Sequence, residues 1–400
     1  MYNRIIYSLI ILFFVPVIAN AQYTFFNPKG SFAIETSLEN TDELRMPMYR
    51  NAMSSLTVYG DFVLGGTSAE TGLTPLLFTS SLSQRKLTAI KQLDGVVKGQ
   101  LSIGTGFTGT KSGDVFYVGT MPQPGIGVGG HIIEVKVNPQ GQITVKDLGE
   151  PVAGEGIFAM TFNPDKSEFY GIVHPSGKFF TFNLKTGATK IYNQTIPSEK
   201  DLDTYHSFAL EPEDYLGRAL LVDQRGRVYG SRSINKLFCF DPATQSFSDL
   251  KDELPFVWGR EAIGRIDSWV TMPEGTIYGS NAADGQLFRL DPVKQTIVNL
   301  GKPIMMPRIM AMTPGKNGML YGVAGASPGY AHLFSYHPQK GFRDLGNPEF
   351  KMVTPGLEQG INWRGFQIAS MATAPRGNYI IMGENEALSQ LMVFPAEDLP

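Results

Sequence analysis

Two arginines precede a Tyr-Gly pair at the same distance. The phrase "RIDSWVTMPEGTIYG" begins at Arg265 and "RIMAMTPGKNGMLYG" begins at Arg308, each 13 residues before its tyrosine. Arg50 and Arg364 lie within one to three residues of the same position in two further copies. The guanidinium fork of arginine matches the geometry of carboxylate and sulfate groups. Because like charges repel each other, several arginines around one opening indicate a binding site for an anion.

Each arginine taken singly also has a local explanation, since it could pair with an acid such as Asp267 or Glu155, or be solvated. As a set, the arginines favour the anion site. We therefore expect Arg265→Ala and Arg308→Ala each to remove most of the turnover and to leave the fold intact, because residues at an exposed opening contribute little to packing.

Most of the histidines map to the same face as the arginines. They are His131, His174, His206 and His332, with Tyr205 beside one of them and Tyr330 near another. Imidazole and phenol groups take up and release protons in catalysis. Each histidine alone has a structural explanation, but four of the five in the chain on one face favour proton transfer there. The histidines and Tyr205 are therefore candidate catalytic residues, and Tyr330 is a candidate substrate contact.

Further substrate contacts are predicted around this face. Arg232 and Lys236, in "SRSINKLF", add positive charge on the same side. Trp363, next to Arg364, could stack against a sugar ring or serve only as a loop anchor.

This set of residue types favours elimination over hydrolysis. Glycoside hydrolysis usually needs two carboxyl groups that flank the bond, and acids are few near the arginines. Removal of the C5 proton of a uronic acid instead needs a cation that neutralises the sugar carboxylate and stabilises the enolate. A histidine or tyrosine then takes the proton, and a second such group protonates the group that leaves at C4. A sugar at C4 makes the reaction a lyase cleavage, and a hydroxyl makes it a dehydration.

The elements that must position these residues form a repeat. The clearest copies contain Tyr-Gly pairs at Tyr170, Tyr229, Tyr278 and Tyr321, spaced by 59, 49 and 43 residues. Weaker copies near Leu64, Val118 and Met382 bring the number to seven. Each copy contains four runs of 4 to 7 residues with alternating hydrophobicity, which indicates strands,. Four-stranded units repeated radially are the blades of a β-propeller.

We therefore expect an all-β chain that forms a single seven-bladed β-propeller, although six or eight blades remain open. The last copy has three evident strands before Pro400. The segment "YTFFNPKGSFAIETSL" has no blade of its own, and we expect it to complete the last blade as the outer strand. This would close the ring and remove an exposed sheet edge.

The first residues and the composition predict the location of the chain. Residues 1–21 are typical of a secretory signal peptide, with a membrane anchor as the alternative, and residues 22–400 would form the propeller domain,. The expected location is periplasmic or secreted, with no membrane insertion after cleavage. The single cysteine, Cys239, excludes an intramolecular disulfide, and a net charge of −3 gives no support for binding nucleic acid,.

The repeated phrase "YG…G-x-LF-x-[FLY]-[DH]-P…LG" resembles the blades of bacterial glycan-active propellers. It is similar to the seven-bladed ulvan and rhamnose–glucuronate lyases of Bacteroidetes glycan-utilisation loci, and to a related oligosaccharide dehydratase. The resemblance implies elimination on a uronate by histidine, tyrosine and arginine, with room for a structural or carboxylate-neutralising divalent metal. It implies that Arg265 and Arg308 hold the carboxylate. No P-loop, Rossmann fingerprint, HExxH or paired CxxC motif is present.

The leading hypothesis is an enzyme of polysaccharide degradation that performs β-elimination on an acidic, ulvan-type oligosaccharide. The alternative from another class is a non-catalytic propeller that binds a glycan or a protein. A lactonase-like metal hydrolase is a third reading, but it requires more acidic ligands on the axis than the sequence offers.

Overall fold

The structure is a computed structural model. It describes residues 25–36, 52–110, 113–193, 211–232, 235–255, 264–325, 331–351, 362–364, 367–384 and 390–396. In these residues the secondary structure is nearly all strand, with one short helix, α4 (Pro212–Tyr215), and 3-10 turns at Leu93–Gly95 and Lys316–Gly318. The expectation of an all-β chain is confirmed. Several predicted features lie outside the described residues, namely the expected signal peptide, Arg50, Tyr205, His206 and Tyr330.

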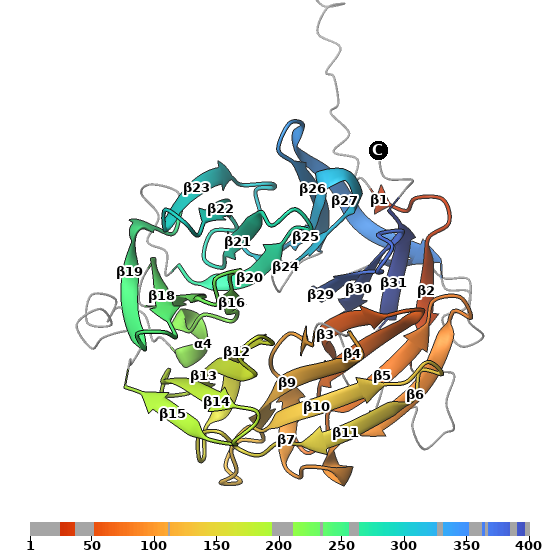
Figure 1. Cartoon of the computed structure of the whole chain (residues 1–400). Helices are drawn as coiled ribbons and strands as arrows, with labels where there is room; N and C mark the ends of the chain where they lie inside the picture. Colours follow the sequence, from red (N-terminus) through yellow and green to blue (C-terminus); the bar gives the residue numbers. More distant parts are fainter. Residues whose placement is uncertain are drawn as a thin grey trace, which may run out of the picture.

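The sheets are arranged around a common centre (Figure 1). Three consecutive sheets have four strands in sequence order. The first contains β12 (Gly156–Asn163), β13 (Glu168–His174), β14 (Phe179–Asn183) and β15 (Thr189–Tyr192). The second contains β16 (Leu221–Val222), β17 (Val228–Arg232), β18 (Lys236–Asp241) and β19 (Ser246–Glu253). The third contains β20 (Ile266–Thr271), β21 (Ile277–Asn281), β22 (Leu287–Asp291) and β23 (Thr296–Gly301).

Two further sheets contain strands from both ends of the chain. One contains β24 (Ile309–Pro314), β25 (Leu320–Ala324), β26 (His332–His337) and β27 (Gly341–Lys351), with β1 (Phe25–Phe26) and β28 (Asn362–Arg364) beside β27. The other contains β29 (Ile368–Thr373), β30 (Tyr379–Glu384) and β31 (Gln390–Pro395), with β2 (Phe32–Glu35) antiparallel to β31.

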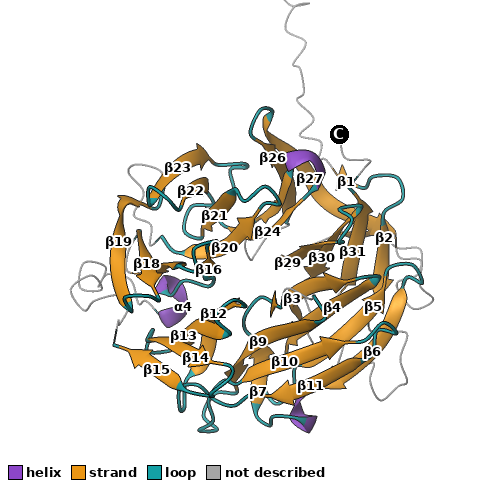
Figure 2. Ribbon diagram, in the orientation of Figure 1, coloured by secondary structure: helices purple, strands orange, loops and turns teal. Residues whose placement is uncertain are grey.

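The remaining strands form one nine-stranded sheet. It begins with β3 (Ala52–Tyr59), β4 (Phe62–Ser68), β5 (Leu76–Ser81) and β6 (Lys86–Gln92). It continues with β7 (Gln100–Ile103), β8 (Thr108–Gly109), β9 (Val115–Pro122), β10 (Ile132–Val137) and β11 (Ile143–Asp147). The strand β7 joins the two parts because it pairs with both β4 and β9. Strands dominate every part of the ring, and loops connect them at its two ends (Figure 2).

The repeated Tyr-Gly pair has a packing explanation. On five of the second strands the glycine lies directly opposite a phenylalanine on the third strand, as in Gly279 and Phe288. A Cβ added at Gly279 would come within 2.4 Å of the Phe288 ring. The same contact occurs for Gly65 with Phe78, Gly171 with Phe180, Gly230 with Phe238, and Gly322 with Phe334. The glycine is therefore required because the aromatic ring lies flat across its backbone, and the ring fills the core between neighbouring sheets.

The tyrosines of these pairs are also buried, and this predicts loss of stability at alkaline pH. Burial raises the pKa of Tyr321 to about 12, and raises the pKa of Tyr170, Tyr229 and Tyr278 as well. Above pH 10 these phenols ionise in the unfolded chain but not in the folded one. Stability is therefore complete below about pH 10 and falls by about 1.4 kcal/mol per pH unit for each such tyrosine. Urea unfolding at pH 9, 10 and 11 would test this; a flat dependence would contradict it.

Hydroxyl groups connect three of the sheets to the inner strand of the neighbouring sheet. Ser231 on β17 accepts a hydrogen bond from the backbone of Ile266 at 2.9 Å, and Ser280 on β21 donates to the carbonyl of Ile309 at 3.1 Å. Ser370 on β29 donates to the carbonyl of Met53 on β3 at 3.1 Å. These bonds fix the points at which the inner strands begin. In the described part of the chain, no helix is both long and apolar enough to cross a bilayer.

Candidate active site in the central cavity

A cavity of about 860 Å³ lies at the centre of the ring. Its wall contains residues of β3, β7, β12, β20, β24 and β29, together with loops such as the glycine-rich segment around Gly125. Serine and threonine hydroxyls alternate with methionine and aromatic side chains on this wall. Two of the predicted catalytic residues, His174 and Arg308, line the cavity.

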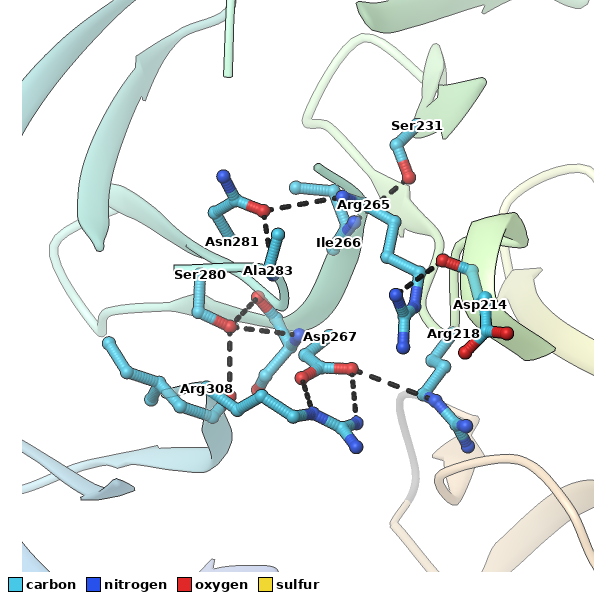
Figure 3. Close-up of polar contacts among 12 residues, drawn as sticks. Asp214, Arg218, Ser231, Arg265, Ile266, Asp267, Ser280, Asn281, Ala283 and Arg308 are labelled. Carbon is cyan, nitrogen blue, oxygen red and sulfur yellow. Dashed lines mark hydrogen bonds and ion pairs between the residues drawn. The ribbon is translucent and has the colours of Figure 1, made fainter. Parts of the chain in front are cut away.

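The most charged part of the wall is a group of arginines around one buried carboxylate (Figure 3). Arg308 donates two hydrogen bonds to Asp267, from Nε and Nη2, each of 2.8 Å. The Nε of Arg218 lies 3.7 Å from the same carboxylate. The Asp267 side chain is 1% exposed and that of Arg308 is 21% exposed. Arg308 therefore acts as a structural partner of Asp267, and its fork is already occupied.

Arg265 completes this group from one side. As expected, Arg265 and Arg308 directly precede the inner strands β20 and β24. Arg265 donates through Nη1 to the carbonyl oxygen of Asp214 in α4, and its buried Nε has no hydrogen-bond partner among the described residues. Arg265 lies next to the cavity but does not line it. The expectation that both arginines are free residues at an opening is therefore corrected: both are largely engaged by the protein.

The cationic charge of this group exceeds what Asp267 neutralises. Burial, together with the charges of Arg308 and Arg218, lowers the pKa of Arg265 to about 10, against the attraction of Asp267. Burial also lowers the pKa of Arg218, with Asp267 acting in the opposite direction. The pKa of Arg308 is raised, because its hydrogen bonds to Asp267 and the negative charge of that carboxylate outweigh the effect of burial. Glu213 and Asp214 also act on these arginines with their negative charges, so a further anion is favoured only at guanidinium nitrogens that these carboxylates leave open.

Arg218 is the arginine best placed to receive that anion. Its side chain is 39% exposed and lines the cavity. Its terminal nitrogens point away from Asp267 in Figure 3. The guanidinium carbon lies 5.2 Å from the centre of the Phe158 ring, which supports it from one side. An arginine with a supported and unoccupied fork can bind a carboxylate through two hydrogen bonds.

The proton-transfer groups of the cavity contact the same phenylalanine. The His174 ring stacks on Phe158 with centroids 5.8 Å apart and an interplanar angle of 25°. The Nε2 of His174 lies 2.6 Å from Oε1 of Glu213, a residue of α4, but not in the direction of a hydrogen bond. His174, Glu213, Phe158 and Arg218 thus form one continuous patch of the cavity wall, which we call the dyad patch.

The structure does not bring His131 and His332 to this cavity. His131 Nδ1 lies 2.9 Å from Oδ1 of Asp147, and His332 Nδ1 lies 3.5 Å from Oδ1 of Asp344. Both histidines begin third strands, and these strands lie further from the centre than the inner strands (Figure 1). The expectation of several histidines around one opening therefore holds for His174 and not for these two.

These two histidines belong to a repeated structural motif. Asp147, Asn299 and Asp344 each accept a backbone hydrogen bond of 2.8 Å from the glycine two residues later, in the phrases "DLG", "NLG" and "DLG". In the middle copy, the side-chain partner is Gln286, to which Asn299 donates at 2.8 Å. A glutamine in the equivalent place shows that the motif needs a hydrogen-bonding side chain and not a titrating group.

We predict that His131→Gln keeps its activity, because glutamine already serves this motif in another sheet. His131→Ala should cost about 1 kcal/mol of unfolding free energy, since it removes one partner of a part-buried bond. Urea unfolding and turnover of both variants would check this. A large loss of turnover in His131→Gln at unchanged stability would return this histidine to the list of catalytic candidates.

The other predicted contacts lie outside the cavity or outside the described side chains. Arg232 pairs with Asp249, and Lys236 is exposed at the start of β18. Trp363 and Arg364 are part of β28, which pairs with the outer strand β27, and their side chains are not among those described. None of the described members of this set lines the cavity.

Sequence reasoning missed the members of the dyad patch other than His174. Arg218 was overlooked because it stands 11 residues before its Tyr-Gly tyrosine, two fewer than Arg265 and Arg308. A signal was nevertheless present, since "GR" precedes the inner strand at both Arg218 and Arg265. Glu213 and Phe158 carried no such signal. The acid Glu155 is used elsewhere, because it lies 3.5 Å from Lys178 and accepts from the backbone of Ser176.

A metal has no evident set of ligands in the described residues. No group of three or more histidine, cysteine, aspartate or glutamate side chains comes together there. The acid nearest the arginines, Asp267, is held by guanidinium groups.

Comparison with known proteins identifies the architecture. No protein-family model and no curated protein matches the chain. Virginiamycin B lyase from Staphylococcus aureus, in a catalytically inactive form with quinupristin, superposes with a TM-score of 0.58 at 10% identity, covering 91% of this chain and 99% of that one. The β-propeller domain of Cps50 (Swd1) from Myceliophteria thermophila gives 0.56 at 9% identity, covering 92% and 99%. The chain has a β-propeller fold.

A third propeller-like neighbour is the periplasmic gluconolactonase of Pseudomonas aeruginosa, with a TM-score of 0.50 at 13% identity, covering 77% of this chain and 86% of that one. These neighbours have unrelated names, and at such low identity the likeness concerns the fold alone. The function of this propeller must therefore be argued from its own cavity.

Proposed function

We propose that this propeller is a carbon–oxygen lyase that performs β-elimination on a uronic acid within an acidic oligosaccharide. The observation that supports this most is the dyad patch, in which an open arginine and a histidine–glutamate pair share one aromatic support. In this proposal Arg218 binds the sugar carboxylate, and the His174–Glu213 pair handles the proton. The neighbours of Arg218 keep its side chain in position and set the charge around it; they are Arg265, Arg308 and Asp267.

The reaction conserves all atoms without a redox partner. The base takes the C5 proton, the C5–H electron pair forms the C4–C5 double bond, and the C4–O bond breaks. The oxygen that leaves receives a proton, either on the departing sugar or as water. In a glucuronate the C5 hydrogen and the C4 oxygen lie on the same face of the ring, so one group can serve both ends of the transfer. The arginine charge stabilises the enolate that develops on the carboxylate.

An ulvan-type glycan is the substrate that we propose, on the basis of the repeated blade phrase. We also propose a periplasmic or secreted location, from the signal-like first 21 residues. The cavity is large enough for more than one ring of such a ligand, since ligand pockets of about 300–1,000 Å³ enclose whole small molecules.

The experiment is to incubate the protein with a panel of oligosaccharides that contain glucuronate or iduronate. Ultraviolet absorbance of the unsaturated uronate reports elimination, and mass spectrometry separates cleavage from loss of water. A heat-denatured sample is the control. If no member of the panel yields an unsaturated product, the lyase proposal is wrong.

A non-catalytic propeller that binds anionic glycans is the second candidate. It is favoured by one observation, that Nε2 of His174 is covered and lies against Glu213, so this nitrogen is not open to a ligand. Binding of uronate oligosaccharides without turnover, measured by calorimetry, would support this candidate.

For the ring itself, we propose seven blades that are closed by β2. Support comes from the pairing of β2 with β31 and from the hydrogen bond between Ser370 and Met53, which links the last sheet to the first. Ile34 of β2 is completely buried. Ile34→Ala should therefore lower the unfolding free energy by about 2–5 kcal/mol. A change below 1 kcal/mol in urea unfolding would show that β2 does not complete the ring.

A further inference from the structure

The atom of the dyad patch that is open to the cavity belongs to Glu213. The Glu213 side chain is 48% exposed, whereas that of His174 is 21% exposed. The Nε2 of His174 is buried and has no hydrogen-bond partner among the described residues. Oε1 of Glu213 lies 2.6 Å from that nitrogen, outside the direction of a hydrogen bond. A ligand in the cavity therefore meets the Glu213 carboxylate before it meets this imidazole nitrogen.

The short helix α4 holds Glu213 firmly at this place. Leu216, directly after α4, is completely buried. Asp214 accepts a hydrogen bond from the backbone of Glu211 at 3.1 Å, and its carbonyl accepts one from Arg265. Glu213, between these anchors, is left without a described hydrogen bond of its own and turns toward the cavity. Its backbone is thus fixed while its carboxylate is free to react.

The charges around Glu213 suit a proton acceptor. The carboxylate is close enough to Arg218 to act on the pKa of that arginine. It also lies 2.6 Å from the Nε2 of His174. In a uronate the C5 hydrogen is two bonds from the carboxylate carbon, and Arg218 and Glu213 line the same cavity, so a carboxylate on Arg218 brings this hydrogen into the neighbourhood of Glu213.

We propose that Glu213 is the catalytic base of the elimination and that His174 is its positioning partner, an inference that rests on the lyase function proposed above. A Glu213 oxygen takes the C5 proton and becomes a carboxylic acid. The C5–H electrons form the C4–C5 double bond as the C4–O bond breaks. The same carboxylic acid then protonates the oxygen that leaves on the same face, which restores the carboxylate. His174, supported by Phe158, holds the carboxylate in the direction of the substrate.

The test compares Glu213→Ala, His174→Gln and the matched control Glu274→Ala, an exposed acid in the turn between β20 and β21. General-base catalysis contributes about 10²–10⁴-fold. We expect kcat of Glu213→Ala to fall by about 1,000-fold, with KM changed less than about threefold. Added formate should restore at least a tenth of the lost rate, because a small carboxylate can enter the exposed space. Thermal unfolding checks that each variant is folded.

His174→Gln should retain more activity than Glu213→Ala, and Glu274→Ala should match the wild type. If Glu213→Ala keeps most of its activity while His174→Gln is inactive, the histidine is the base and the proposal is wrong. If Glu213→Ala loses its activity and formate does not restore it, Glu213 has only a structural role, and this result also overturns the proposal. A wild-type protein inactive on every uronate is a different failure, because it removes the lyase function together with this role.

Discussion

Arg218→Gln should lower kcat/KM for a uronate oligosaccharide by roughly 100-fold or more. The reason is that Arg218 alone among the three arginines of the group combines exposure to the cavity with a fork that Asp267 does not occupy. A carboxylate held by two charge-assisted hydrogen bonds loses several kcal/mol of binding when glutamine replaces the arginine. If the propeller only binds its glycan, the same loss should be seen in Kd.

The fold should tolerate this change. The Arg218 side chain, which is 39% exposed, makes a cation–π contact with Phe158 and a 3.7 Å ion pair with Asp267. Asp267 keeps its two bonds from Arg308. We expect the unfolding free energy to change by less than about 1 kcal/mol.

Arg225→Gln is the matched control for this experiment, because Arg225 is an exposed arginine in the turn at the other end of β16. It should have wild-type kcat/KM. If both changes lower kcat/KM equally, the cause is the net charge of the protein and not a specific binding site. Wild-type kinetics in Arg218→Gln would exclude it as the carboxylate-binding residue.

The architecture could be predicted from the sequence because it depends on local and repeated constraints. The Tyr-Gly pair recurs since each glycine must accept an aromatic ring from the next strand, as Gly279 accepts Phe288. The position of Arg265 and Arg308 before the inner strands could also be predicted, because one strand and one turn set the distance from each arginine to its tyrosine. Such distances are readable in a single sequence.

The roles of the side chains could not be predicted in the same way. The bond from Arg308 to Asp267 joins two neighbouring sheets across 41 residues. Pairing with an acid such as Asp267 was one explanation open for each arginine taken singly, but the arginines taken as a set favoured the anion site. Glu213 belongs to a long crossing between two copies, outside the repeated phrase, so no repeat revealed it. His131 resembled a catalytic residue because the sequence does not show how far a third strand lies from the axis.

Asp267→Asn should lower the unfolding free energy by about 3–5 kcal/mol, the usual effect of removing one member of a buried ion pair. The carboxylate is 1% exposed and receives two bonds from Arg308, with Arg218 and Arg265 close by. Without its charge, three guanidinium groups would face one another with no buried anion between them. Urea unfolding would measure the change, and Asp94→Asn, at an exposed acid, is the control.

Two further results would separate the buried pair from the anion site. Asp267→Asn combined with Arg308→Met should recover part of the lost stability, because removal of both partners leaves no uncompensated buried charge. Sulfate or glucuronate should stabilise Asp267→Asn more than the wild type, since a ligand that binds the folded state raises its stability by mass action. The opposite result would be an Asp267→Asn protein that is as stable as the wild type and is not stabilised by these anions. It would mean that the repulsion among the arginines is too weak to favour binding of a carboxylate. The cavity would then lose its main physical reason to select an acidic sugar.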